Sequence, residues 1–149
     1  MKFRTVFRTI LFLVVVIATF ISCNNDEYKT GADDVSDTVK EGTWKVVYFY
    51  DAGEVKTQNY TGYNFTFNNN TTLTASKDTN SYPGAWSVSK STSDDDISST
   101  FFMISFDAPD VLIPLTGKWK VMENTGTSLK LKDDSKGELA VDYLTFDKN

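Results

Sequence analysis

From residue 43 onward the sequence alternates apolar and polar side chains in short runs, and this pattern limits what the chain can fold into. A period of two places every second side chain on one face, as in a half-buried β-strand. The same region shows no convincing 3.6-residue period, so we expect an all-β domain. Eight or so short strands joined by tight turns form either an antiparallel sandwich or a closed barrel. The predicted strands cover 43–51, 63–69, 71–77, 85–90, 100–107, 118–124, 128–134 and 138–148, with a weaker one at 55–61.

A Gly-x-Trp motif occurs three times and decides between these two architectures. All three tryptophans lie in it, at Trp44, Trp86 and Trp119, each with Gly two positions before and Val two positions after. The glycine allows a bend or a close backbone approach where a strand enters the sheet. The tryptophan then points inward and fills the end of a barrel. Spacings of 42 and 33 residues are too uneven for a solenoid or a propeller. We therefore expect a closed barrel, with Trp44 and Trp119 as plugs.

Aromatic residues are abundant, with 11 Phe, 7 Tyr and 3 Trp, and many fall on predicted inward positions. Two interpretations stay open: the rings fill a small core, or some line a cavity that opens at one end. The alternation in 43–51 places Tyr48 and Tyr50 on the same face as Trp44, where their hydroxyls would orient the polar end of a ligand. The expected lining residues are Tyr48, Tyr50, Phe65, Phe67, Trp86, Phe102, Ile104 and Phe106.

Several of these elements, taken in order, resemble a known family. The sequence has an opening G-T-W-K-V, a central G-x-W before a hairpin, a later L-T-G-K-W-K-V followed by S-L-K-L, and a closing Y-L-T-F. Together they resemble the lipocalin-like, calycin-type domains of Bacteroidota lipoproteins, over residues 42–149. The resemblance implies an up-and-down β-barrel of about eight strands, and it includes carriers of small apolar ligands.

The first 22 residues have the pattern of a secretory signal peptide. Lys2, Arg4 and Arg8 precede an apolar run over residues 10–21, and no acidic residue occurs there. As a helix this run would be roughly 18 Å long, which is short of the ~30 Å hydrocarbon core of a membrane. A basic start and a short apolar run before a small residue are typical of a cleaved leader.

Cys23, the only cysteine, directly follows this segment. Ser22-Cys23 resembles a bacterial lipobox, with Phe20 where Leu is usual, as in Bacteroidota lipoproteins. The resemblance implies cleavage before Cys23 and acylation of its new N-terminus, which attaches the protein stably when two or more acyl groups are present. Asp26-Glu27 resembles the acidic signal that directs such proteins to the cell surface, so we expect an outer-membrane, surface-exposed lipoprotein. The alternative is a free thiol or an intermolecular disulfide.

Residues 23–41 are polar and acidic, which predicts a flexible tether between the membrane and the barrel. Its expected r.m.s. reach is about 25 Å. Within it, Asp37-Thr38-Val39 resembles the three-residue O-glycosylation signal of Bacteroidota, which makes Thr38 the candidate acceptor.

Composition argues against several functions. The chain has no His, so it lacks Ser-His and Cys-His bases and His-ligated zinc sites. Asp94-Asp95-Asp96 lacks the spacing of a calcium loop, and we expect no metal, cofactor or catalytic residue. A net charge of −5, which becomes more negative when the basic leader is removed, argues against binding to nucleic acid.

Two non-enzymatic functions stay open. The first is a lipoprotein that carries a small apolar or amphipathic ligand inside its barrel. The second is a structural or interaction subunit with a filled barrel, which engages another envelope protein or a glycan through its outer face or loops. The run 100–107 bears on this choice, because it is apolar on both faces. Either another segment covers its outer face, or that face is offered to a partner.

Overall fold

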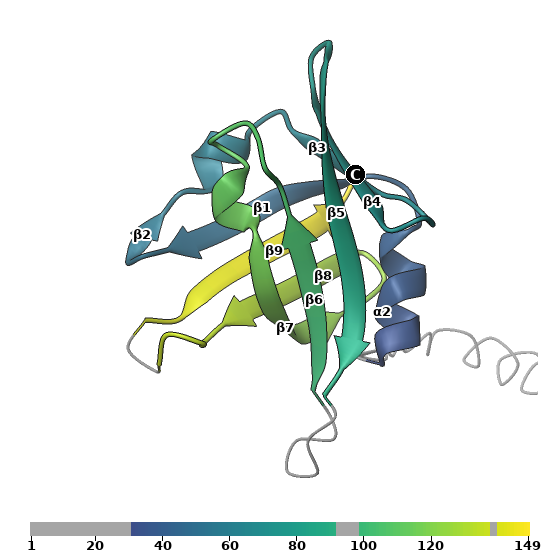
Figure 1. Cartoon of the computed structure of the whole chain (residues 1–149), viewed down its shortest axis with the longest axis vertical. Helices are drawn as coiled ribbons and strands as arrows, with labels where there is room; N and C mark the ends of the chain where they lie inside the picture. The colour runs from purple at the N-terminus through teal and green to yellow at the C-terminus, as the bar shows by residue number, and fades with distance from the viewer. Residues whose placement is uncertain (1–30, 92–98, 138–139) are drawn as a thin grey trace, which may run out of the picture.

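Antiparallel strands close into a barrel, as the alternation and the tryptophan motif predict (Figure 1). The computed structural model describes residues 31–91, 99–137 and 140–149. The predicted leader 1–22, the predicted acylation site Cys23 and the acidic run Asp94–Asp96 lie outside these ranges. The strands are β1 (Trp44–Asp51), β2 (Glu54–Val55), β3 (Asn64–Phe67), β4 (Thr72–Lys77), β5 (Asn80–Lys90), β6 (Thr100–Ser105), β7 (Gly117–Asn124), β8 (Ser128–Asp133) and β9 (Asp142–Lys148).

Strand β1 closes the barrel by pairing with β3 on one side and β9 on the other. Strands β3 to β9 pair in sequence order, so the eight-stranded barrel is up-and-down, and β2 adds a short hairpin to the end of β1. The two sides of β1 differ. Six residue pairs join it to β9, whereas Trp44 opposite Phe65 is the single registered pair with β3.

A short 3₁₀ helix, η1 (Thr57–Tyr60), continues where the β1–β3 pairing ends. The amide of Phe49 donates to Thr57 Oγ1 at 2.9 Å, and the amide of Lys56 donates to the carbonyl of Phe49 at 2.8 Å. These bonds satisfy backbone groups of β1 that would otherwise be unpaired. The weak strand predicted at 55–61 is therefore β2 followed by η1.

A β-bulge in β1 reverses which of its side chains face inward. The register with β9 shifts between Val46 and Tyr48, because Val47 is an extra residue in the ladder. Beyond the bulge Phe49 is fully buried, Tyr48 is 40% exposed, and Tyr50 lies on the same outer face. The prediction that Tyr48 and Tyr50 share the inner face with Trp44 is wrong for this reason.

The helix α2 (Ala32–Val39) lies against one end of the barrel, where residues 23–41 were expected to form a flexible tether. Val35 and Val39, one helical turn apart, are fully buried. Asp33 and Asp34 occupy the first turn, where the helix dipole favours negative charge. Residues 32–39 are thus part of the folded domain. No helix among the described residues is long and apolar enough to cross a membrane.

The opposite end of the barrel is covered by η1 and by a second 3₁₀ helix, η2 (Ile113–Leu115) (Figure 1). Helix α2 contacts the start of β1 and the end of β7, through Trp44 and Asn124. The two 3₁₀ helices contact the other ends of those strands, through Phe49 and Trp119.

The three glycines of the tryptophan motif meet different requirements. Gly42 has a φ of +76°, which favours glycine. At Gly84, a Cβ would lie 2.6 Å from the carbonyl oxygen of Ser105 and 2.7 Å from the ring of Phe106, so only glycine fits beside β6. At Gly117, the nearest atom to a Cβ would be Trp119 Nε1 at 3.4 Å. The three glycines therefore recur in the sequence for different structural reasons.

Candidate functional site

The predicted lining residues of the interior pack against one another. Phe65, Phe67, Trp86, Phe102, Ile104 and Phe106 are each at most 5% exposed and belong to one continuous hydrophobic core. Phe67 lies at the centre, with its ring 5.4 to 5.7 Å from those of Trp86, Phe102 and Phe146 in edge-to-face contacts. Phe65 makes the same kind of contact with Phe146 at 5.3 Å. These geometries are those preferred by aromatic rings in a filled core.

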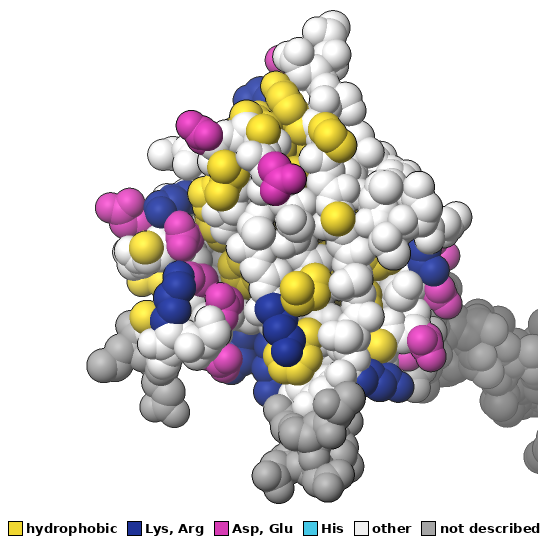
Figure 2. Space-filling view, viewed as in Figure 1, with side chains coloured by type: hydrophobic (Ala, Val, Ile, Leu, Met, Phe, Trp, Pro, Cys, Tyr) yellow, Lys and Arg dark blue, Asp and Glu magenta, His cyan; other side chains and the backbone are white. Residues whose placement is uncertain are grey.

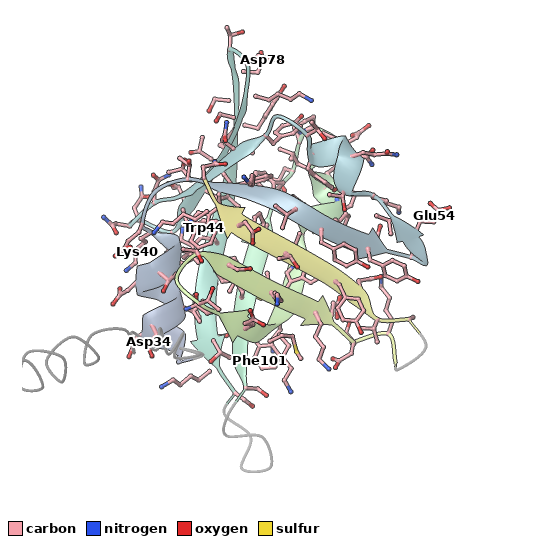
Figure 3. The ribbon with its side chains drawn as sticks, turned by 180° about the vertical axis from the view of Figure 1, so that it is seen from behind. Asp34, Lys40, Trp44, Glu54, Asp78 and Phe101 are labelled. Carbon is pink, nitrogen blue, oxygen red and sulfur yellow. The ribbon has the colours of Figure 1, made fainter. Side chains whose placement is uncertain are left out.

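Each tryptophan of the repeated motif donates its indole N–H to a backbone carbonyl. The acceptors are Val39 for Trp44 at 2.9 Å, Asn68 for Trp86 at 3.0 Å and Leu115 for Trp119 at 3.0 Å. Val39 ends α2 and Leu115 ends η2, so Trp44 and Trp119 hold covering segments at opposite ends of the barrel (Figure 3 shows Trp44 beside α2).

A second set of rings occupies the end covered by the 3₁₀ helices. Phe49 lies between Tyr60 of η1, at 5.3 Å, and Trp119, at 6.3 Å. Tyr60 is almost fully buried, and this burial raises the pKa of its hydroxyl far above the usual value. Large side chains therefore lie under both ends of the barrel.

The candidate glycosylation site Thr38 lies on α2 and is half-buried. Its hydroxyl accepts a hydrogen bond from Asn124 Nδ2 at 3.2 Å, which ties the helix to the end of β7. A glycan on Thr38 would have to replace this contact. The glycosylation of Thr38 and the acylation of Cys23 stay predictions.

Three tyrosines, Tyr48, Tyr50 and Tyr143, lie on the outer face of β1 and β9. The first two were expected on the inner face, and Tyr143 was not predicted as a site residue. Tyr50 is directly opposite Tyr143 in the ladder, and their rings are 6.4 Å apart with a tilt of 50°. Tyr143 is 43% exposed, as Tyr48 is 40% exposed. Figure 3 looks onto this face, with Glu54 marking the tip of the β1–β2 hairpin. Tyr143 could have been found from the alternation in β9, since Leu144 and Phe146 point inward.

A hollow of about 560 Å³ opens beside this tyrosine pair. Tyr50 and Tyr143 form one wall, the turn residues Ala52 and Gly53 form another, and Asp142 lies at the start of β9 beneath it. Its volume is within the range of ordinary small-molecule sites, about 300–1,000 Å³.

Buried Asp142 links the start of β9 to the β1–β2 turn beside the hollow. Its Oδ1 accepts a hydrogen bond from the amide of Ala52 at 2.9 Å, and its Oδ2 accepts one from Lys136 Nζ at 3.1 Å. The hydrogen bond to Asp142 raises the pKa of Lys136. Nearby, Lys56 Nζ lies 2.7 Å from Asp51 Oδ2, and this hydrogen bond raises the pKa of Lys56. Both lysines are therefore held in ion pairs with carboxylates of the barrel end.

Strand β6 is apolar on both faces, and its outer face is partly covered by a neighbouring side chain and partly exposed. Phe101 is half-buried, and Lys118 Nζ lies 3.9 Å from the centre of its ring in a cation–π contact. Met103, two residues along, is 40% exposed. On the face shown in Figure 2, hydrophobic side chains lie in several small groups separated by polar surface.

A smaller hollow of about 230 Å³ lies between α2 and β5, with Lys40, Ser36 and Trp86 among its lining residues.

Within the described ranges, no group of three His, Cys, Asp or Glu side chains is placed to hold a metal ion.

The fold resembles that of a solved structure. A crystal structure of a DUF4847 family protein from Bacteroides vulgatus, at 1.00 Å resolution, matches 77% of this chain and 97% of its own, with a TM-score of 0.51 and 20% sequence identity. At this identity the likeness concerns the fold alone. No protein-family model matches the sequence, and no curated protein matches it.

Proposed function

We propose that this protein is a lipid-anchored outer-membrane protein whose barrel is a non-enzymatic binding module that works through its outer surface. One observation carries this proposal. The aromatic residues at inward positions fill the interior with mutual ring contacts. Tyr48, Tyr50 and Tyr143 instead face outward, and Tyr50 and Tyr143 line an open hollow. A filled barrel with exposed aromatic surface is suited to recognition outside the barrel.

The lipid anchor and surface location are proposed from the sequence. Ser22-Cys23 follows a basic and apolar leader, and Asp26-Glu27 follows the cysteine. The resemblance of the sequence to lipocalin-like Bacteroidota lipoproteins supports the same assignment. The absence of His from the sequence, with the single Cys used for acylation, supports a role without catalysis.

Carriage of an apolar ligand inside the barrel, the other function expected from the sequence, would require the core rings to move. Phe67 touches three other rings and is 1% exposed, so a ligand at that position would have to displace it. Interiors packed in this way resist such rearrangement. The geometry therefore favours external recognition.

Small apolar probes distinguish the two functions. The full-length protein, purified in detergent, is titrated with fatty acids, sterols and benzene while its tryptophan fluorescence is followed, and native mass spectrometry of protein from its own host tests for a retained lipid. We expect no saturable binding and no retained molecule. Phe67→Ala provides the control, because removing a buried ring leaves an apolar cavity that takes up benzene. Saturable one-to-one binding by the unmodified protein would overturn external recognition and support the carrier.

A further inference from the structure

We propose that the hollow beside Tyr50 and Tyr143 binds a neutral carbohydrate, with one sugar ring stacked on the exposed tyrosine. This inference rests on the proposed function, since it assigns a ligand class to the outer surface. It starts from the exposure of Tyr143, which is 43% accessible even though its strand is paired on both sides. A tyrosine on the outer face of a β-sheet offers a flat aromatic ring to a ligand.

The tyrosines are held firmly. Tyr143 is paired with Tyr50 on one side and with Lys132 on the other, in the centre of a three-stranded region of the barrel wall. Val55 lies opposite Tyr50 on the far side of β1 and is 59% exposed. A ligand that stacks on this ring orders no backbone, because the strands are already paired, and a tyrosine has only two side-chain torsions to fix.

The charged groups around the hollow, of which Asp142 lines it directly, argue against an anionic ligand. Asp142 is paired with Lys136, Asp51 with Lys56 and Lys132 with Asp134, at distances of 3.1, 2.7 and 2.7 Å. A site for an anion such as phosphate needs a surplus of cationic donors, and a site for a cation needs a surplus of carboxylates. All three lysines are paired, and Glu54 and Asp133 add further carboxylates, so this region offers no surplus of cationic donors to an anion. Among the described residues no three carboxylates are placed to hold a metal ion either, which leaves a neutral ligand with hydroxyl groups as the best match.

The combination of an aromatic ring and paired polar groups fits the chemistry of a sugar. A pyranose has an apolar face of C–H groups, which packs on an aromatic ring, and a rim of hydroxyls that both donate and accept hydrogen bonds. The tyrosine hydroxyls, the ammonium of Lys136 and the carboxylates of the pairs match that rim. A fatty acyl group lacks such hydroxyls and would leave these polar groups desolvated without partners.

The matched variants are Tyr143→Ser, which removes the ring, and Tyr143→Phe, which keeps the ring and removes its hydroxyl. Met103→Ser is the control, because Met103 is equally exposed, on β6, outside the lining of the hollow. Since these side chains are exposed, all three variants are expected to melt at temperatures close to that of the unmodified protein. Melting curves of the same samples check this.

The full-length protein in detergent is applied to an array of neutral gluco-, manno-, galacto- and xylo-oligosaccharides, with sulfated oligosaccharides and peptides alongside, and binding is quantified by calorimetry. We expect binding to a neutral oligosaccharide that changes little between low and high salt. Tyr143→Ser should weaken it about tenfold or more. Tyr143→Phe keeps the stacking ring and loses one hydroxyl of the rim, so it should weaken binding less than Tyr143→Ser does, and Met103→Ser should leave the affinity unchanged.

Other outcomes overturn this inference in distinguishable ways. Binding to sulfated sugars alone, or equal losses in Tyr143→Ser and Met103→Ser, would exclude a neutral sugar at this hollow. Binding of a peptide but no sugar, lost in Tyr143→Ser, would overturn the carbohydrate and leave external recognition standing. Absence of sugar binding together with saturable uptake of an apolar probe by the unmodified protein would overturn both proposals.

Discussion

The indole N–H of Trp44 donates to the carbonyl oxygen of Val39, and this bond joins the first residue of β1 to the last residue of α2. The last carbonyls of a helix have no partner within the helix. Here the acceptor is buried, so the tryptophan supplies a hydrogen bond that water cannot. In the motif, the indole N–H of Trp44 or Trp119 on a barrel strand binds the backbone carbonyl of a segment that covers the barrel end. The sequence does not reveal this contact, because the carbonyl lies outside the motif.

Trp44→Phe should destabilise the fold by about 1–3 kcal/mol, since it leaves a buried carbonyl without a donor. Trp86→Phe should cost less, because its acceptor, the carbonyl of Asn68, is only partly buried and water can replace the indole. Urea denaturation of both variants measures the difference, and hydrogen exchange of the α2 amides should rise in Trp44→Phe. Equal losses of stability in the two variants would show that the hydrogen bond to the Val39 carbonyl contributes no more than the one to Asn68.

Gly84→Ala should destabilise the barrel by about 1–3 kcal/mol or more, because its Cβ would overlap the backbone of β6 and the ring of Phe106. Gly117→Ala is the matched control in the same motif, and its Cβ meets nothing closer than 3.4 Å. Urea midpoints of the two variants should therefore differ. If Gly84→Ala melts like Gly117→Ala, strands β5 and β6 are not as close at that point as the structure has them.

Lys136→Met tests the ion pair between Lys136 and Asp142 through the pH dependence of stability. The hydrogen bond to Asp142 raises the pKa of Lys136 above its usual value of 10.5. A raised folded-state pKa gives stability that is present in full below 10.5 and is lost as the pH rises through the folded-state value. The melting difference between Lys136→Met and the unmodified protein should thus be constant from neutral pH to about pH 9 and shrink above about pH 11.

The control for this pH series is Lys90→Met, at the exposed end of β5. Its melting temperature should stay close to that of the unmodified protein at neutral pH. A Lys136→Met difference that instead grows at alkaline pH would contradict the ion pair with Asp142.

Cys23→Ala should release the protein from the membrane or leave its leader uncleaved, because an acylated Cys23 is the proposed anchor. Fractionation of cells that express the two forms, with mass spectrometry of the mature N-terminus, measures this. The Ser22→Ala variant keeps the cysteine and a small residue before it, and it should fractionate like the unmodified protein. Unchanged membrane association of Cys23→Ala would contradict the lipoprotein assignment.

The strand pattern was predictable because one buried face repeats every second residue, and the runs around Phe65, Leu73 and Leu129 obey that rule in the structure. The orientation of Tyr48 and Tyr50 was not predictable in this way. One extra residue in the ladder, Val47, exchanges the inner and outer faces for all later residues of β1. Either alternation of TWKVVYFYD places aromatic rings on the buried face, so the sequence does not mark the position of the bulge.

Helix α2 was missed because only Val35 and Val39 form its apolar face, in an otherwise acidic and polar stretch. Two apolar residues make too weak a period to separate a helix from a linker. Their four-residue spacing and the acids in the first turn were the available signals. The hollow could not be found from sequence, because it depends on Asp142 reaching across to the β1–β2 turn.

The packing of α2 also sets how far the barrel can stand from a lipid at Cys23. Only residues 24–31 separate that cysteine from the helix, and even a fully extended segment of this length spans no more than about 30 Å. The α2 end of the barrel would consequently face the bilayer at short range. The hollow lies at the far end of β1, a strand about 25 Å long at the usual rise per residue. An anchored molecule would thus present its tyrosines toward the surrounding medium and keep its helix toward the lipid.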